Sequence, residues 1–380
     1  MLENISEVNE CLLRELPMNN LNIKEHFTGC LLGGAIGDSL GWPIEFNDME
    51  SVIQKYGPTG IQEMEQGEGG KFEITDDTQM TLFTAEGLLR AWTSARHTGG
   101  LPDFAATVRS SYLSWLKTQG ETSSLHPKVF RPGWLLSVEG LHRRRAPGNT
   151  CLSALIDGSI TENGIVTNAS KGCGGVMRAA PAGLLAANII DGDSASTARL
   201  AFEIGCATAS ITHGHPSGYY PAGVLASVIA SIITGGSIED GIRISLAFLD
   251  GRFGAKETID AVQSALDLWQ DPNVIPSTET VESLGEGWTG EEALAIGLYC
   301  ALVAGDDLVK GVRLAVNHSG DSDSTGSITG NILGALHGER AIPKEWLSQL
   351  ELEDVIKQVG EDLFTTFEGS ENWLKRYPPM

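Results

Sequence analysis

The spacing of apolar residues in this 380-residue chain predicts helices along most of its length. Clusters of glycine, proline and aspartate separate the periodic segments, and stretches that alternate apolar with polar residues are few. Residues 51–74 and 130–150 lack a helical period and are expected to be loops. We predict helices at about 26–40, 78–95, 103–118, 197–210, 220–234, 237–249, 255–269, 291–304, 308–318, 324–337 and 350–358.

This pattern predicts one all-α domain spanning residues 26–380, preceded by an N-terminal extension at residues 1–25. No low-complexity linker, internal repeat or shift of composition marks a second boundary. Within the extension, Val8, Leu12 and Leu16 are spaced to form an apolar stripe on one face of a short helix.

Glycine recurs every fourth residue in two of the predicted helices, which would leave a groove free of side chains along each. Each glycine inside a helix costs ~1 kcal/mol relative to alanine, so such a stripe needs a compensating contact. We expect close approach of another helix; a weak or broken helix is the alternative. The positions are Gly33, Gly37 and Gly41 in the first helix and Gly326, Gly330, Gly334 and Gly338 in the other.

Composition limits the classes of function. Apolar residues make up 41% and charged residues 20%, as in ordinary globular proteins, while a net charge of −23 disfavours nonspecific binding to nucleic acid or to anionic membranes. The acidic N-terminus is unlike a secretory signal, and no apolar run reaches the ~18–20 residues of a membrane span. Six cysteines are scattered without a CxxC pair, which fits a reducing compartment. We therefore expect a cytoplasmic location.

Two clusters of carboxylates and hydroxyls, at residues 75–78 and 320–324, each lead into a predicted helix. Such oxygens are the ligands that Mg²⁺ and Mn²⁺ prefer, whereas carboxylates crowded without a cation would repel one another. Taken singly, each cluster also suits the first turn of a helix, where Thr, Ser and Asp cap free amides. If the fold unites the clusters, a site for one or two divalent cations is the simplest interpretation.

Other segments carry candidate chemistry with an ordinary structural alternative beside each. Glu45, between Ile44 and Phe46, would suit water activation beside a metal, or a plain loop salt bridge. The glycine-rich segment 171–178 could cradle phosphate or form a simple turn. The pair His213 and His215 could contact a ligand or make loop hydrogen bonds. Trp288 could stack on an aromatic ligand or belong to the core.

Six segments in order along the chain together resemble the ADP-ribosylglycohydrolase family, the relatives of dinitrogenase reductase-activating glycohydrolase and ADP-ribosylarginine hydrolase. They are GCLLGGAIGDSLGWPIEF at 29–46, TDDTQMT at 75–81, SKGCGGVMRAAP at 170–181, THGHPSGYYPAG at 212–223, EEALAIGLYCAL at 291–302 and NHSGDSDSTGSITGNILGALHG at 317–338. The resemblance implies a compact single-domain helical fold with a binuclear Mg²⁺ or Mn²⁺ centre in a cleft.

The same resemblance assigns roles by motif. The metal ligands would be Thr75, Asp76, Asp77, Asp321, Asp323 and Ser324, although the family usually carries threonine where Ser324 stands. Glu45 would lie near the metals and the scissile bond, and Asp77 would share in catalysis. The ADP-ribose side of the substrate would contact Gly172, Cys173, Gly174, Gly175, Val176, Met177, Arg178, His213 and His215. Trp288, outside the matching segments, is added as a substrate-binding candidate because its ring could stack on an aromatic ligand.

The function expected from this resemblance is metal-dependent hydrolysis of the bond between ADP-ribose and a protein side chain, with arginine the first choice. The alternative is an immunity-type protein that neutralises an ADP-ribosyltransferase toxin, by hydrolysis or by blocking its active site with residues 1–25. A pseudo-enzyme is disfavoured because the acidic set is intact. The expected partners are an ADP-ribosylated protein and, in the alternative, a cognate transferase, with no nucleic acid or membrane.

Overall fold

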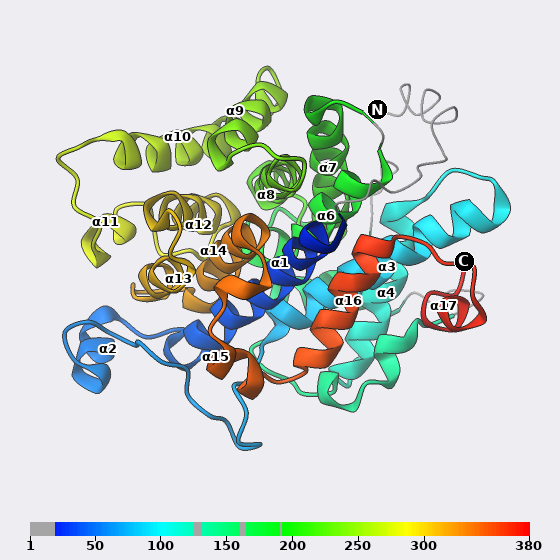
Figure 1. The fold of residues 1–380 in the computed structure, drawn as a ribbon, viewed down its shortest axis with the longest axis horizontal. Coiled ribbons are helices and arrows are strands. Elements are labelled where there is room, and N and C mark those ends of the chain that lie inside the picture. The colour runs from blue at the N-terminus through cyan, green and yellow to red at the C-terminus, as the bar shows by residue number, and fades with distance from the viewer. Residues whose placement is uncertain (1–19, 125–130, 160–164, 191) are drawn as a thin grey trace.

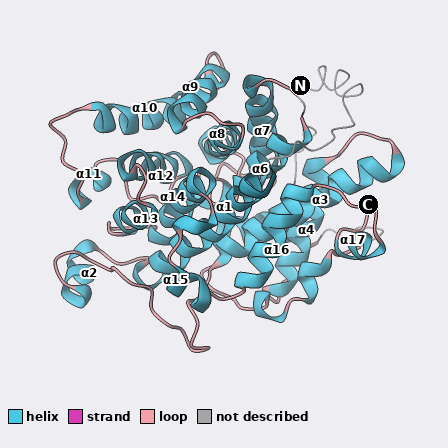
Figure 2. Ribbon diagram, viewed as in Figure 1, coloured by secondary structure: helices cyan, strands magenta, loops and turns pink. Residues whose placement is uncertain are grey.

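The computed structural model describes residues 20–124, 131–159, 165–190 and 192–380, and its elements are helices joined by loops (Figure 1, Figure 2). The β-type backbone pairing in these ranges is limited to isolated bridges such as Gly172 with Thr289. The all-α prediction is therefore confirmed. The predicted apolar stripe at Val8, Leu12 and Leu16 lies outside the described residues.

With ends that differ by up to seven residues, the largest differences being at the start of the first helix and the end of the last, each helix expected from the apolar period is present. These are α1 (Asn20–Gly41), α3 (Asp76–Thr98), α4 (Phe104–Thr118), α7 (Ser194–Ala209), α8 (Pro216–Ile233), α9 (Ile238–Leu249), α10 (Lys256–Gln270), α12 (Gly290–Ala304), α13 (Leu308–Val316), α14 (Ser322–His337) and α16 (Glu353–Thr365).

Shorter helices were not expected from the period. They are α2 (Met49–Tyr56), α5 (Asn149–Asp157), α6 (Ala180–Ile189), α11 (Thr278–Glu282), α15 (Lys344–Gln349) and α17 (Glu371–Arg376), with 3-10 turns at Trp42–Ile44, Trp134–Ser137, Glu139–Leu141, Cys173–Gly175 and Glu339–Ala341. The loop prediction for 51–74 is wrong at 51–56, where the Asp48 side chain caps α2 and Gly57 ends it with φ 91°. The prediction for 130–150 missed the two 3-10 turns and the start of α5.

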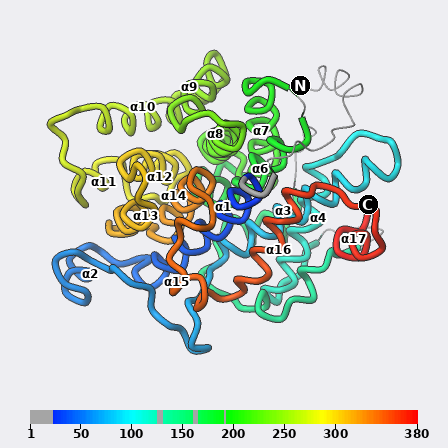
Figure 3. The backbone as a smooth tube through the Cα atoms, in the orientation of Figure 1, coloured from blue at the N-terminus to red at the C-terminus, as the bar shows by residue number. Residues whose placement is uncertain are grey.

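The two glycine stripes face each other where α1 packs along α14, at the centre of the molecule (Figure 1, Figure 3). A Cβ added at Gly37 would lie 1.9 Å from the carbonyl oxygen of Gly326, and one at Gly330 would lie 2.0 Å from that of Gly33. The helices thus approach to backbone contact, as the stripes predict. Gly338 is the exception, because it ends α14 with φ 76°.

Helix α8 is long and apolar enough to cross a membrane by length and composition, but 83% of it is buried inside the protein. A core helix passes the same test. Its apolar surface is covered by α7, α9 and α6, which are among its main packing partners.

Candidate functional site

Three segments far apart in the sequence bring carboxylates to one place. The loop after α1 carries Glu45, the first turn of α3 carries Asp76 and Asp77, and the start of α14 carries Asp321 and Asp323. Ligand oxygens of Glu45, Asp321 and Asp323 all lie within 4.8 Å of one another. Because α1 and α14 pack through glycine, the ends of both helices are held rigidly beside each other.

Asp38 is a further member of this group that the sequence analysis did not single out. It lies on α1, is fully buried, and its carboxylate accepts hydrogen bonds from the amides of Thr75 at 3.0 Å and Thr78 at 3.1 Å. Asp38 thereby fixes the start of α3 against α1. One feature of the sequence could have pointed to Asp38. It is a single carboxylate inside an apolar, glycine-rich helix, and its own helix offers it no partner.

Both acidic clusters also cap helices. Helix capping and assembly into one acidic group are therefore both present. The hydroxyl of Thr75 accepts from the amide of Asp77 at 3.2 Å, and Asp321 accepts from the amide of Ser324 at 3.3 Å. Asp321, and not Ser324, is the cap of α14. Capping orients the carboxylates of the first turn toward the same space and places partial positive charge behind them.

Burial and mutual repulsion act on the whole acidic group, which comprises Asp38, Glu45, Asp76, Asp77, Asp321 and Asp323. Burial first, and then the charge of Asp323, raise the pKa of Asp38 to about 7 and that of Glu45 to about 11. Burial likewise raises the pKa of the other four carboxyls. The ionised cluster is therefore unstable by itself.

The donor set fits hard divalent cations. Among the described residues no lysine, arginine or histidine forms an ion pair with any of the six carboxylates. The Oδ2 of Asp77 and the Oε2 of Glu45 are buried without a hydrogen-bond partner. Carboxylate oxygens left unpaired in this way are those a Mg²⁺ or Mn²⁺ ion would satisfy.

The glycine-rich segment 172–175 lies against this group and is tied to the loop before α12. The amide of Cys173 donates to the carbonyl of Trp288 at 3.0 Å, and the amide of Gly290 donates to the carbonyl of Lys171 at 2.8 Å. A Cβ at Gly175 would lie 2.3 Å from the carbonyl of Gly218, so the loop is packed tightly against the start of α8. Residues 172–174 are partly exposed, whereas residues 175–178 are buried.

Arg178 and His213 support the loop from inside the protein. Arg178 is 1% exposed; its guanidinium donates to the hydroxyl of Thr212 at 2.6 Å and lies over the ring of Tyr112. Burial, and then the charge of Arg178, lower the pKa of His213 to about 3, so its imidazole is neutral. His215 instead caps α8, its ring accepting from the amide of Ser217. Substrate contact by these three side chains stays a prediction.

An aromatic pair lies beside Glu45. Phe46 is 67% exposed, adopts φ 66°, which is unusual for a residue with a side chain, and stacks on Trp288 with ring centroids 5.2 Å apart. The loop of Trp288 contacts the acidic group directly, since the amide of Asp321 donates to the carbonyl of Glu286. The pair therefore forms an apolar surface next to the carboxylates.

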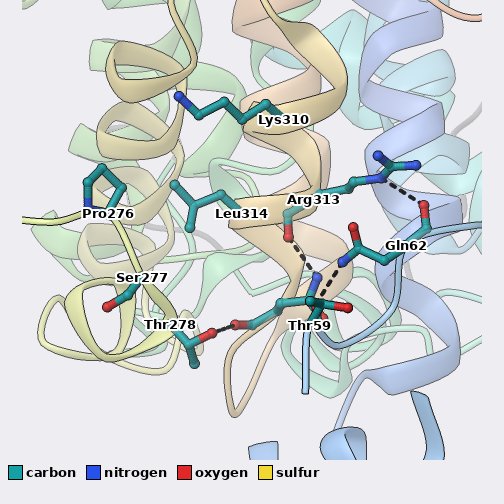
Figure 4. Close-up of a pocket in the computed structure, with 9 residues that line it drawn as sticks. Thr59, Gln62, Pro276, Ser277, Thr278, Lys310, Arg313 and Leu314 are labelled. Carbon is teal, nitrogen blue, oxygen red and sulfur yellow. Dashed lines mark hydrogen bonds between the residues drawn. The ribbon is translucent and has the colours of Figure 1, made fainter. Parts of the chain in front are cut away.

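A separate pocket of about 420 Å³ lies outside the acidic group (Figure 4). Its walls are residues of α13 and of the segments at 59–62 and 276–278: Thr59, Gln62, Pro276, Ser277, Thr278, Lys310, Arg313, Leu314 and Asn317. Arg313 donates to the carbonyl of Gln62, and the side-chain amide of Asn317 both donates to and accepts from the backbone of Ile61. These bonds brace the segment that leads to Asp321.

Comparison with known proteins finds similarity over most of the chain. A family model described as ADP-ribosylglycohydrolase matches residues 19–372. The chain is 25% identical to the ADP-ribosyl-[dinitrogen reductase] glycohydrolase of Rhodospirillum rubrum, over 88% of this chain and 93% of the relative. It is also 25% identical to the ADP-ribosylarginine hydrolase Tri1 of Serratia proteamaculans, over 88% of this chain and 78% of the relative. A solved ADP-ribosylglycohydrolase-related protein complex shares the fold, with a TM-score of 0.62 and 23% identity over 90% of this chain and 98% of that one.

Proposed function

This chain belongs to the ADP-ribosylglycohydrolase family and is therefore a hydrolase of ADP-ribosyl bonds, and we propose that it removes ADP-ribose from modified arginine side chains with two Mg²⁺ or Mn²⁺ ions. The observation that carries this proposal is the group of six carboxylates, five buried and that of Glu45 half-buried, with unpaired oxygens on Asp77 and Glu45. Thr75, Asp76, Asp77, Asp321, Asp323 and Ser324 would hold the ions.

Bound there, the cations would hold the ribose hydroxyls and lower the pKa of a water molecule. Glu45, ionised once cations balance its neighbours, would orient that water and accept its proton. The water oxygen joins the anomeric carbon, the bond to the side-chain nitrogen breaks, and the nitrogen takes up the proton. Positive charge develops on the ribose as that bond breaks, and Asp77 would stabilise it.

The glycine-rich loop would bind the diphosphate. The amides of Cys173 and Val176 already donate to carbonyls of the protein and Gly175 is buried, so the amide of the partly exposed Gly174 is the better candidate for phosphate. His213 and Arg178, packed beneath the loop, would fix its shape.

Arginine is favoured as the modified side chain by what surrounds Glu45. The exposed face of Phe46, stacked on Trp288, would attract a guanidinium through its π electrons, and the surrounding carboxylates would add to that attraction. The chain's net charge of −23 acts in the same direction. A neutral serine linkage would gain neither contribution.

The test is release of ADP-ribose from arginine-, serine- and DNA-linked substrates, with Mg²⁺, Mn²⁺ or EDTA. We expect release from the arginine-linked substrate, dependent on metal and lowered by orders of magnitude in Asp77→Asn. The exposed Asp306 gives a matched control, because Asp306→Asn makes the same change of charge at the surface. Full activity of Asp77→Asn with metal still bound would contradict the site, and preference for another linkage would contradict the choice of arginine.

A further inference from the structure

A short loop, residues 143–148, runs along the start of α3 and touches the acidic group. The amide of Gly148 donates to the Oδ2 of Asp76 at 3.1 Å, and the side-chain amide of Gln79 donates to the carbonyl of Arg143 at 2.8 Å. Asp76 is the first residue of α3 and is 4% exposed. The loop therefore reaches a carboxylate of the candidate metal centre through a backbone hydrogen bond.

Arg145 anchors this loop to the chain that enters α3. Its Nη1 donates to the carbonyl of Ile74 at 2.8 Å and to the carboxylate of Glu351, and its Nη2 lies 3.1 Å from the Oε1 of Glu73. The side chain of Arg145 is only 11% exposed, so these contacts are largely shielded from water. One planar guanidinium thus holds three acceptors at once, a role that suits its fixed fork of donors. We call these contacts the Arg145 clamp.

The backbone between the clamp and the bond to Asp76 is strained. Ala146 has φ 43°, in the left-handed region that residues with a side chain seldom adopt. Pro147 follows it, and a proline further restricts the residue before it. Such a conformation persists only where surrounding contacts hold it, and here they lie on both sides, at Arg145 and at Gly148. Loss of either contact should let the loop relax away from Asp76.

The loop supports one member of the acidic group. The amides of Thr75 and Thr78 hold Asp38 without it, and the Oδ2 of Asp77 has no hydrogen-bond partner among the described residues. A defect in the loop should therefore act on cation binding through Asp76 and leave the other carboxylates in place.

We propose that Arg145 and the amide of Gly148 position Asp76 for the metal centre, with Arg145 acting only through the loop. The inference rests on the metal ions of the proposed function. A free carboxylate turns about its side-chain bonds and can offer either oxygen, or both, to a cation. The amide of Gly148 engages Oδ2 and leaves Oδ1 to bind a cation. A carboxylate oriented before the ion arrives binds it with a smaller loss of conformational freedom.

The test is binding of Mn²⁺ to the full-length, metal-free protein, followed by the electron paramagnetic resonance signal of the free ion. Gly148→Pro removes the N–H, and the φ of −55° at this position suits proline. We expect the Kd for Mn²⁺ to rise about ten- to hundredfold. The matched control is Gly148→Ala, which keeps the N–H; its Cβ would lie 3.9 Å from the nearest atom, the Sγ of Cys151, so the Kd should stay near the wild-type value.

Arg145→Met tests the clamp, because it keeps an unbranched side chain and removes the donors. We expect the Kd for Mn²⁺ to rise about tenfold, and Arg145→Lys, which keeps the charge without the fork, to lie between this variant and the wild type. Arg144→Met makes the same change one residue earlier, at a half-exposed side chain that pairs with Glu121, and should bind Mn²⁺ as the wild type does.

The Tm in EDTA separates positioning from stability. A purely structural role would lower the Tm of Arg145→Met and leave its Kd for Mn²⁺, measured far below the Tm, unchanged. That result would overturn the inference, as would an unchanged Kd in Gly148→Pro or an equal rise in Gly148→Ala. If Arg145→Met does not fold, the comparison of the two Gly148 variants decides.

Hydrolysis measured alongside distinguishes this inference from the proposed function. If the loop variants bind Mn²⁺ as the wild type does while metal-dependent hydrolysis persists, the inference fails and the proposed function stands. If they bind Mn²⁺ more weakly but the wild type with Mn²⁺ releases no ADP-ribose, the proposed function fails and the positioning role stands. A wild type that binds no Mn²⁺ would overturn both.

Discussion

Replacing Gly330 with alanine tests whether backbone contact between α1 and α14 holds the site together. The added Cβ would lie 2.0 Å from the carbonyl oxygen of Gly33 and 2.5 Å from its carbonyl carbon. Real Cβ atoms essentially never approach another atom closer than 3.0 Å. Both atoms belong to the backbone, so no side-chain rotation relieves the clash and the two helices must separate.

The magnitude follows from two opposing effects. Alanine is favoured over glycine inside a helix by ~1 kcal/mol. Against this, the helices must separate by about 1 Å, the difference between 3.0 and 2.0 Å, and a gap of that size forfeits a quarter to a half of each dispersion contact along the pair. Overpacking of a close contact costs typically ~1–3 kcal/mol, occasionally more. We expect a net loss of about 2 kcal/mol in the free energy of unfolding.

The assay is urea unfolding of the wild type and Gly330→Ala, with EDTA and with Mg²⁺. The matched control is Gly369→Ala, because nothing lies within 4 Å of a Cβ at that position and its free energy should change by less than about 0.5 kcal/mol. We also expect weaker Mg²⁺ binding in Gly330→Ala, since Asp321 and Asp323 begin the displaced helix. A urea midpoint and slope equal to those of the wild type would refute the argument.

Three further changes test other parts of the molecule. Glu45→Gln should lower kcat by roughly 10²–10⁴ in ADP-ribose release while calorimetric affinity for free ADP-ribose stays near wild type, and a full-rate variant would remove Glu45 from catalysis. Phe46→Ala should raise KM about three- to tenfold for the arginine-linked substrate and leave a serine-linked one unchanged; equal effects on both would contradict guanidinium recognition. Burial raises the pKa of Glu86 from 4.5 to about 7, so the folded state favours the protonated form and stability from this group is lost as pH rises through 7. The side chain in Glu86→Gln is neutral at every pH. The free energy of unfolding of this variant, relative to that of the wild type, should therefore increase by up to about 3 kcal/mol from pH 5 to pH 8. A difference that does not change with pH would contradict this pKa.

The sequence predicts the long helices because their apolar faces repeat with the helical period. It also predicts that another helix packs closely on each glycine stripe, since a row of glycines is costly unless another backbone fills the groove, but it does not show that α1 and α14 are each other's partners. Helix α2 was missed because eight residues give little period, and its ends depend on the Asp48 cap and Gly57. For short helices, local capping residues determine where the helix begins and ends, which the apolar period cannot show.

The site is predictable only in part for a similar reason. Paired carboxylates with hydroxyls mark the two clusters, but no spacing along the chain could show that they meet. Asp38 and the contact of Cys173 with Asp321 arise from packing between distant segments, and single residues in apolar surroundings give no pattern to detect. The exposed, strained Phe46 is likewise invisible until its φ angle and its stacking on Trp288 are known.

Charge balance explains why this arrangement can exist in a stable fold. The amino ends of α3 and α14 both point at the acidic group, and each contributes roughly half a positive charge. Together they supply about +1 against six carboxylates, so without cations several of these groups must stay protonated, in keeping with their raised pKa values. Two divalent cations would bring the total to about +5 and allow nearly all the carboxylates to ionise. The same helix ends that cap and position the acidic residues thus leave a deficit of positive charge, and that deficit supports the proposal that the group holds metal ions and a substrate that develops positive charge.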